Sequence, residues 1–534
     1  MYAGARRLTV ACLVSLLVLA IPSAVATDVT VAFDVEAGAY GSEVRISSEY
    51  FNYPRLAIDL GGVSPRRGTM YVLGLTSITC ADIVVSISSD GGGTFSAPTA
   101  SSGLCLRGPS LDVVMAPDGA MYVATWGPQI LRSGDGALSW DLVATLGNST
   151  VAGVLAMDSD GTLYVAWSGG AWGTPNTGSV MVSVSQDGGG NWTAPVSILP
   201  PGITGSSAQI AATGSKVVVA YVGEDAGASH VAVVNSTDAG VSWGAETRLS
   251  SPFSCAWVSA PSVAASVSGI FAVSWYFEPA TAPSGCWDNW GNQTEVRVAI
   301  LSDSVLPTIV QRIAGPAWPS VTFGDAIAFD DRSQVYVTWH SIAPEWSSAS
   351  VYVAAGGRTG SLSTTLKVPG GNSTQQENLA AGPGGSVWVV WKVVNYFDPT
   401  DSRIGIYVRR VVGGAFVEVT GAEAVLPLAV EIEHPSHGSL LATWSGAPIR
   451  FDDLPPGMYE VRIRGGNGST SAGSAPVDAF GITTIRLEIG QTLAPFPWLP
   501  VSVLAAVAVA ATIGTLVWMR HRRRSQKSLI RERR

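Results

Sequence analysis

Residues 185–192 read SQDGGGNW, with a serine, an aspartate, a run of glycines and an aromatic residue in a fixed order. Three other segments of this 534-residue chain follow the same outline, S-x-D-x-G-x-[ST]-W. They are SSDGGGTF at 88–95, SGDGALSW at 133–140 and STDAGVSW at 236–243. Four copies in the same order identify an internal repeat, and such a repeat predicts an array of similar structural units.

Each residue type in the repeat suits the corner of a β-hairpin. Glycine adopts the positive φ angles that other residues resist, and the final Trp or Phe buries a large apolar area under the corner. The motif has too few oxygen ligands for a calcium loop. We therefore assign its aspartates to folding, because each carboxylate can accept hydrogen bonds from its own turn; they are Asp90, Asp135, Asp187 and Asp238.

Apolar strands alternate with this repeat. A short apolar segment, a turn and an aromatic-rich strand, such as LYVAW at 163–167, precede each copy. Seven such units lie within residues 40–420, the last three without the aspartate motif, and their ends fall about 40 to 65 residues apart. This is the size of a four-stranded propeller blade. The segment from Glu43 to Ile46 is expected to close the ring by joining the last unit.

The repeat resembles the Asp-box, or BNR repeat, of the sialidase-like β-propellers. The resemblance implies an all-β propeller fold. The count of units predicts seven blades, whereas the sialidases themselves have six. Composition agrees, because only 13% of the residues are charged, against about 25% in an average soluble domain, and glycine occurs 60 times. Such a chain is not a helical bundle or a coiled coil.

Residues 422–490 predict a small second β-domain. Leu454-Pro455-Pro456-Gly457-Met458-Tyr459 resembles the LPPGxY corner of carboxypeptidase-regulatory-like, Ig-like β-sandwiches. This resemblance implies a stalk between the propeller and a membrane. Residues 491–498 contain two prolines and predict a short, stiff linker.

Both ends of the chain carry membrane-related signals. Residues 1–26 combine two arginines, an apolar run and an Ala-x-Ala ending, which predict a secretory signal peptide; an uncleaved anchor is the alternative. Residues 499–519 contain no charge and are long enough to cross a bilayer as a helix. The arginine-rich tail 520–534 then lies in the cytoplasm and the propeller outside, as in a type I single-pass protein at the cell membrane.

The charge balance bears on the possible partners. The chain carries −9 overall, of which the tail supplies +7 and the signal segment +2, so the external part carries −18. This excludes a nucleic-acid partner, which needs a basic surface. The expected partners are the membrane, which one C-terminal helix would enter, and extracellular glycans or surface proteins. No cofactor or metal is expected, and His434 and His437 are placed in an exposed turn.

Cysteines and glycosylation motifs agree with an external location. Four cysteines remain after signal cleavage, and of their three possible pairings the short separations favour Cys80–Cys105 and Cys255–Cys286. Both pairs fall in loops on the face opposite the Asp-boxes. Asn-x-Ser/Thr motifs predict glycosylation at Asn148, Asn191, Asn235, Asn292, Asn372 and Asn467.

That same face collects long loops rich in aromatic and acidic residues. Aromatic rings beside carboxylates predict stacking and hydrogen bonding to sugars; the alternative is that these rings cover blade ends and plug the channel. The ligand-binding candidates are Trp172, Glu278, Trp287, Trp290, Glu345, Trp346 and Tyr396.

Catalytic residues are less clear. The sialidase resemblance implies three arginines, an aspartate acid/base and a Tyr–Glu nucleophile pair. Arg55 lies where the first arginine of that family belongs, although its surroundings read YPRL rather than FRIP, and Asp82 lies near the position of the acid. The alternative for both is a surface ion pair. No motif marks the other arginines or the Tyr–Glu pair.

Three functions follow from these features. The leading hypothesis is a membrane glycoprotein whose propeller binds an extracellular partner such as a glycan. The second is an exo-glycosidase of sialidase type that hydrolyses terminal sugars. The third is a structural component of a surface coat.

Overall fold

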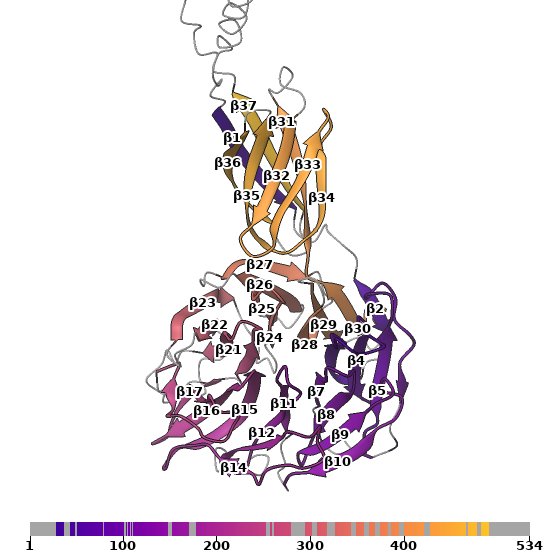
Figure 1. The fold of residues 1–534 in the computed structure, drawn as a ribbon, viewed down its shortest axis with the longest axis vertical. Helices are drawn as coiled ribbons and strands as arrows, with labels where there is room; N and C mark the ends of the chain where they lie inside the picture. Colours follow the sequence, from indigo (N-terminus) through magenta and orange to yellow (C-terminus); the bar gives the residue numbers. More distant parts are fainter. Residues whose placement is uncertain are drawn as a thin grey trace, which may run out of the picture.

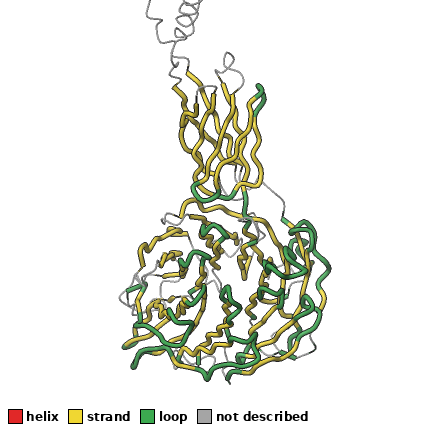
Figure 2. Tube along the Cα trace, viewed as in Figure 1, coloured by secondary structure: helices red, strands yellow, loops and turns green. Residues whose placement is uncertain are grey.

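The computed structural model describes most of the chain between Asp28 and Gly490. The ranges that it describes are 28–36, 43–48, 51–77, 80–100, 103, 105–106, 108, 111–147, 152–169, 178–251, 257–258, 261–278, 294–301, 307–317, 326–342, 349–356, 362–368, 374–382, 386–394, 400–420, 428–465, 468–477 and 482–490. These residues are all β, as expected, and form two parts, a propeller-like ring and a sandwich (Figures 1 and 2).

Seven of the sheets in the described residues lie around the ring (Figure 1). In chain order, the first sheet consists of β3 (Asn52–Ile58), β4 (Met70–Leu75), β5 (Ile83–Ser88) and β6 (Thr99–Ala100), and the second of β7 (Asp112–Met115), β8 (Met121–Thr125), β9 (Gln129–Ser133) and β10 (Asp141–Thr145). The third consists of β11 (Val154–Met157), β12 (Leu163–Ser168), β13 (Val180–Ser185) and β14 (Val196–Ser197). The fourth consists of β15 (Thr204–Thr213), β16 (Lys216–Asp225), β17 (Ala228–Ser236) and β18 (Thr247–Arg248).

The last three sheets of the ring lack the Asp-box. They consist of β19 (Trp257–Val258), β20 (Ser262–Ala265), β21 (Phe271–Glu278), β22 (Thr294–Leu301) and β23 (Pro307–Ala317); β24 (Ala326–Phe329), β25 (Val335–Ile342), β26 (Ala349–Gly356) and β27 (Leu362–Val368); and β28 (Thr374–Ala381), β29 (Val387–Val393), β30 (Gly405–Arg410) and β2 (Val44–Ser47).

The innermost strands contact one another in cyclic order. These contacts run from β3 through β7, β11, β15, β20, β24 and β28, and β28 contacts β3 again. Strand β2 completes the last sheet by pairing with β30, so the expectation that this segment joins the last unit is confirmed. Apolar clusters fill the space between neighbouring sheets; one of them joins Leu73 of β4 to Leu131 of β9.

The four repeat segments, called Asp-boxes here after the repeat that they resemble, close the hairpins between the third and fourth strands. Asp135 Oδ1 accepts a hydrogen bond from the backbone N–H of Ser139 (3.0 Å), and Oδ2 accepts one from the Ser139 hydroxyl (2.6 Å). Ser133 donates to the same carboxylate (2.8 Å) and accepts from the N–H of Ala137 (2.9 Å). Asp90, Asp187 and Asp238 repeat this network.

An aromatic residue near the start of a second strand packs on the next Asp-box. The Tyr122 hydroxyl donates to the carbonyl oxygen of Gly188 in the following sheet (2.8 Å). The ring of Trp388, in the last sheet, lies against Gly92 of the first box, where a Cβ would come within 2.3 Å of it. This contact joins the last sheet to the first.

The sandwich contains two four-stranded sheets with one apolar core. The first sheet is β1 (Asp28–Glu36), β37 (Ile482–Gly490), β31 (Gly413–Thr420) and β34 (Ile449–Leu454), and the second is β33 (Gly438–Trp444), β32 (Leu428–His434), β35 (Gly457–Gly465) and β36 (Gly468–Val477).

The sandwich is therefore larger than residues 422–490, and the ring ends before residue 420. Strand β31 runs parallel to β37 and buries Ala415 and Val417 in the sandwich core. Strand β1 pairs with β37 along its whole length, from Asp28 opposite Gly490 to Glu36 opposite Ile482. Alternation of apolar residues marks both segments as strands but does not tell which sheet they join.

The sandwich meets the ring at the turn between β24 and β25. His437 Nε2 lies 2.8 Å from Asp330 Oδ2, and Gln334 Nε2 donates to the carbonyl oxygen of Pro456 (2.6 Å). The exposed turn expected for His434 and His437 is thus wrong, because the docking of the two parts buries both rings. Burial lowers the pKa of His437 to about 3 and that of His434 to about 4.

Strands β1 and β37 place both ends of the described chain at the end of the sandwich remote from the ring (Figure 1). The signal segment 1–26, the linker 491–498, the apolar span 499–519 and the tail 520–534 lie outside the described residues. Within the described ranges, no helix is long and apolar enough to cross a membrane.

Candidate functional site

Most of the predicted ligand-binding residues fall outside the described residues. The backbone of Glu278 ends β21, but its side chain is not described. The residues that lie outside are Trp172, Trp287, Trp290, Glu345, Trp346 and Tyr396, together with Cys255, Cys286, Asn148, Asn292, Asn372 and Asn467. The described polar residues at the face opposite the Asp-boxes lie on or beside the inner strands of the ring.

Two glycosylation candidates are described. Asn191 is exposed in the third Asp-box, where its amide donates to Asp187 Oδ2 (2.6 Å). Asn235 is half-buried in β17, opposite Val218 of β16. A glycan is therefore more easily accommodated at Asn191 than at Asn235.

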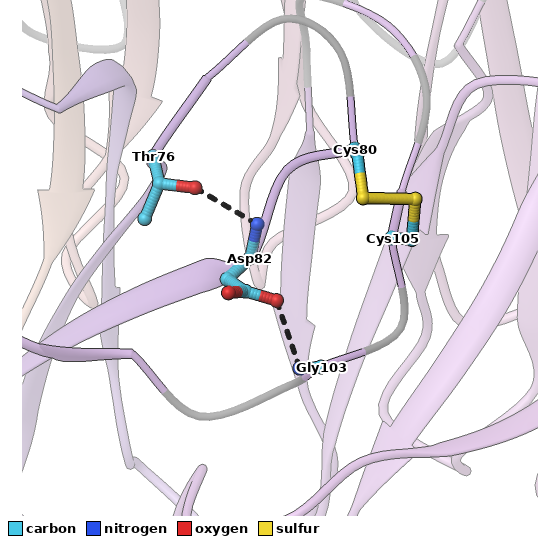
Figure 3. The surroundings of a disulfide bond; sticks show 5 residues. All are labelled: Thr76, Cys80, Asp82, Gly103 and Cys105. Carbon is cyan, nitrogen blue, oxygen red and sulfur yellow. Dashed lines mark hydrogen bonds between the residues drawn. A yellow bond between two sulfur atoms is a disulfide. The ribbon is translucent and has the colours of Figure 1, made fainter.

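The disulfide between Cys80 and Cys105, the expected pairing, holds two loops together at the face opposite the Asp-boxes (Figure 3). Asp82 lies beside it: its backbone N–H donates to the Thr76 hydroxyl (2.9 Å), and its Oδ1 accepts from the N–H of Gly103 (2.8 Å). Both hydrogen bonds order the disulfide loops. This geometry gives Asp82 a positioning role in the loops.

Arg55 lies just past an irregular start of the inner strand β3. The register of β3 against β4 shifts between Asn52 and Arg55, and Tyr53 adopts a φ of 56°, which is rare for a residue other than glycine. Bulges of this kind re-aim side chains and are frequent next to functional sites. Inner strands β15 and β28 shift register near their starts as well.

Arg55 pairs with Asp112 at the start of the neighbouring inner strand. Its Nε lies 3.9 Å from Asp112 Oδ1, and about a quarter of each side chain is exposed, at 26% and 25%. The other carboxylate oxygen of Asp112 accepts a hydrogen bond from the N–H of Leu155, on the next inner strand (2.8 Å). Burial raises the pKa of Asp112, while Arg55 and this hydrogen bond oppose the shift.

Polar groups of the last sheet lie on the other side of Arg55. Asn378 on β28 accepts a hydrogen bond from the N–H of Leu56 (3.1 Å). Lys392 on β29 donates to Asn52 Oδ1 (3.0 Å), and burial lowers the pKa of its ammonium group to about 8. Three neighbouring sheets thus bring a guanidinium, a carboxylate, an amide and an ammonium group to one end of the ring.

We call Asn52, Tyr53, Arg55, Asp112 and Lys392 the Arg55 site. Its polar side chains offer both donors and acceptors, as hydrogen bonding to sugar hydroxyls requires. Among the described residues of this site, Asp112 is the single carboxylate. A glycosidase uses two carboxyl groups roughly 5 to 10 Å apart, and the described residues of this site contain one carboxyl group.

The sequence reasoning identified Arg55 and missed its partners. Asp112 pairs with Arg55 although 57 positions separate them in the chain, and no local pattern reveals such a contact. Lys392 carried a usable signal, because it stands in the otherwise apolar strand VWVVWKV of a chain with very few lysines. A charged residue in a buried strand is costly unless it has a partner.

Comparison with known proteins gives distant similarity alone. No family model matches the chain, and no curated protein sequence matches it. The solved structures that resemble it include an α-L-arabinanase of Penicillium chrysogenum complexed with arabinobiose, 14% identical over 56% of this chain and 92% of that chain, with a TM-score of 0.38. An ulvan lyase is 12% identical over 69% of this chain and 95% of that chain, with a TM-score of 0.45. The NanB sialidase of Streptococcus pneumoniae is 12% identical over 69% of both chains, with a TM-score of 0.37. These names describe enzymes that act on glycans, but similarity at this level carries no argument about the residues of this chain.

Proposed function

We propose that this chain is a single-pass cell-surface glycoprotein whose seven-bladed, Asp-box propeller binds an extracellular glycan at the Arg55 site. The observation that carries the proposal is that three neighbouring sheets bring Arg55, Asp112 and Lys392 to one end of the ring, beside the bulge at the start of β3. A strained strand end that presents partly exposed polar groups is typical of a binding site.

The arrangement of the two chain ends supports the topology in this proposal. Asp28 pairs with Gly490 at the end of the sandwich remote from the ring. A signal peptide cleaved after Ala26 and a membrane helix beginning at Leu499 would both adjoin that end. The sandwich would then act as a stalk, with the ring held away from the bilayer and the basic tail in the cytoplasm.

An exo-glycosidase of sialidase type is the second candidate. The direction of the Asp112 pKa favours it, because burial raises this pKa and a general acid needs a pKa above that of a free carboxyl group. The mechanism also needs a second carboxyl group nearby, and the described part of the Arg55 site supplies none. Binding without turnover is therefore the better-supported function.

A glycan array probed with the full-length protein in detergent tests the proposal, run beside a fluorogenic sialoside assay. We expect binding to at least one glycan class, without turnover, and loss of that binding in Arg55→Gln. The matched control is Arg486→Gln, which removes an exposed guanidinium from the sandwich. Turnover that depends on Asp112 would favour the glycosidase, and silence in both assays would favour a structural surface component.

A further inference from the structure

A pocket lies at the Asp-box end of the ring, opposite the end that holds the Arg55 site. It has a volume of about 300 Å³ and lies where the last sheet meets the first. The end of β3, the start of β4, the first Asp-box, the start of β29 and the end of β30 form its walls. The residues that matter here are Arg67, Ser89, Ser386, Trp388 and Arg410. Its size is at the lower end of the range for small-ligand pockets, and one or two sugar rings fit it.

The walls of this pocket carry positive charge on an acidic protein. Two guanidinium groups, those of Arg67 and Arg410, line it, and no acidic residue does so among the described residues. Arg67 is exposed and has no ion pair with any described carboxylate. An anion that enters between the two arginines would be held by charge-assisted hydrogen bonds.

Arg410 has capacity left for such an anion. Its Nη1 lies 3.1 Å from Asp453 Oδ2 on the sandwich, but that carboxylate is 59% exposed, so its attraction is weakened by water. The Nε of Arg410 is buried and has no hydrogen-bond partner within the described part of the chain. A buried donor without an acceptor is unfavourable, so the contact with Asp453 does not satisfy all the donors of this guanidinium.

Trp388 adds an apolar wall to the pocket. Its ring is fixed between Gly92 of the first Asp-box and the apolar cluster that contains Ile58 and Met70. An immobilised indole offers a flat surface for the C–H face of a sugar ring, and Ser89 offers a hydroxyl group. The combination of a flat aromatic wall with two guanidiniums distinguishes this pocket from a simple phosphate site.

We propose that this pocket binds a carboxylated sugar, such as a hexuronate unit, with the carboxylate between Arg67 and Arg410 and the ring against Trp388. The site is separate from the Arg55 site, because β3 contributes its Asn52 end to one and its Ile58 end to the other. The proposal therefore stands even if the Arg55 site binds nothing.

The test is calorimetric titration of the full-length protein in detergent with glucuronate, and with glucose as the neutral counterpart. We expect glucuronate to bind at least tenfold more tightly than glucose, and its affinity to fall as the salt concentration rises. Arg67→Gln should weaken glucuronate binding about fivefold or more, since it removes one charged hydrogen bond from a partly solvated site.

Two control variants keep the test specific. Arg132→Gln removes another guanidinium from the Asp-box side of the ring, in the second sheet, and should leave glucuronate binding unchanged. Arg55→Gln should also leave it unchanged, which separates this proposal from that for the Arg55 site. Absence of glucuronate binding, equal binding of glucose, or equal losses in Arg67→Gln and Arg132→Gln would each overturn the proposal.

Discussion

Substitution of Gly92 tests whether the last sheet of the ring packs on the first. Gly92 has a φ of 91°, and a Cβ at this position would lie 2.3, 2.7 and 2.8 Å from three carbon atoms of the Trp388 ring. Gly91 provides a matched control one residue earlier. Its φ is also positive, at 72°, but a Cβ there would have no atom within 4 Å.

The two substitutions share one destabilising effect and differ in the other. An alanine at positive φ costs about 1–2 kcal/mol of folding free energy at either position. Gly92→Ala additionally forces the rigid indole of Trp388 to move, and overpacking of this kind costs about 1–3 kcal/mol. Gly92→Ala should therefore be less stable than Gly91→Ala by about 1–3 kcal/mol.

Thermal denaturation of the full-length protein, followed by tryptophan fluorescence, measures this difference as a gap of a few degrees between the two midpoints. Trp388→Ala in the Gly92→Ala background should remove most of the extra loss, because the clash needs both side chains. Equal midpoints for Gly91→Ala and Gly92→Ala, or additive effects of Gly92→Ala and Trp388→Ala, would refute the closure of the ring at this contact.

Three further predictions concern the Asp-boxes and the topology. Hydrogen bonds from neighbouring Ser residues lower the pKa of Asp135 and Asp238 to about 2. These folded-state pKa values lie below those of the unfolded chain. The stabilisation that the two carboxylates give is therefore complete above about pH 4 and is lost as the pH falls toward 2. The melting midpoint should decline over that interval, and Asp135→Asn should flatten the decline. Trp140 is 7% exposed whereas Trp192 is half-buried, so Trp140→Ala should cost about 3–5 kcal/mol in denaturant titrations and Trp192→Ala clearly less. Protease added to intact cells should remove the ring and leave the basic tail intact; a protected ring would contradict the type I orientation.

The contacts that could be predicted from the sequence are local ones. In each Asp-box, the aspartate bonds a residue three or four positions later, so the motif itself contains both partners. Apart from β2 and β19, neighbouring strands within a ring sheet also follow one another along the chain, as consecutive strands usually do. The Cys80–Cys105 pairing also depended on a short separation along the chain.

The contacts that could not be predicted depend on which sheets become neighbours. The motif places an aromatic residue under each box, but the surrounding sheets decide that Trp140 is buried and Trp243 is partly exposed. The ion pair of Arg55 with Asp112 depends on how two inner strands of different sheets are aligned with each other, and a local pattern does not reveal that alignment. The burial of His437 needs the sandwich to dock on Asp330, more than 100 positions earlier in the chain.

The two N-terminal strands of the described chain belong to different parts of the fold, one to the sandwich and one to the ring. Strand β1 completes a sandwich sheet by pairing with β37, and β2 completes the last ring sheet by pairing with β30. Each of these sheets is complete only when an N-terminal strand has met a strand more than 350 positions later in the chain, and such long-range pairing slows folding. Because β37 also leads toward the expected membrane span, β1 strengthens the strand through which the sandwich would be attached to that span. Removing residues 28–47 would therefore deprive both parts of a strand at once, because β1 is a structural element of the sandwich and β2 of the ring.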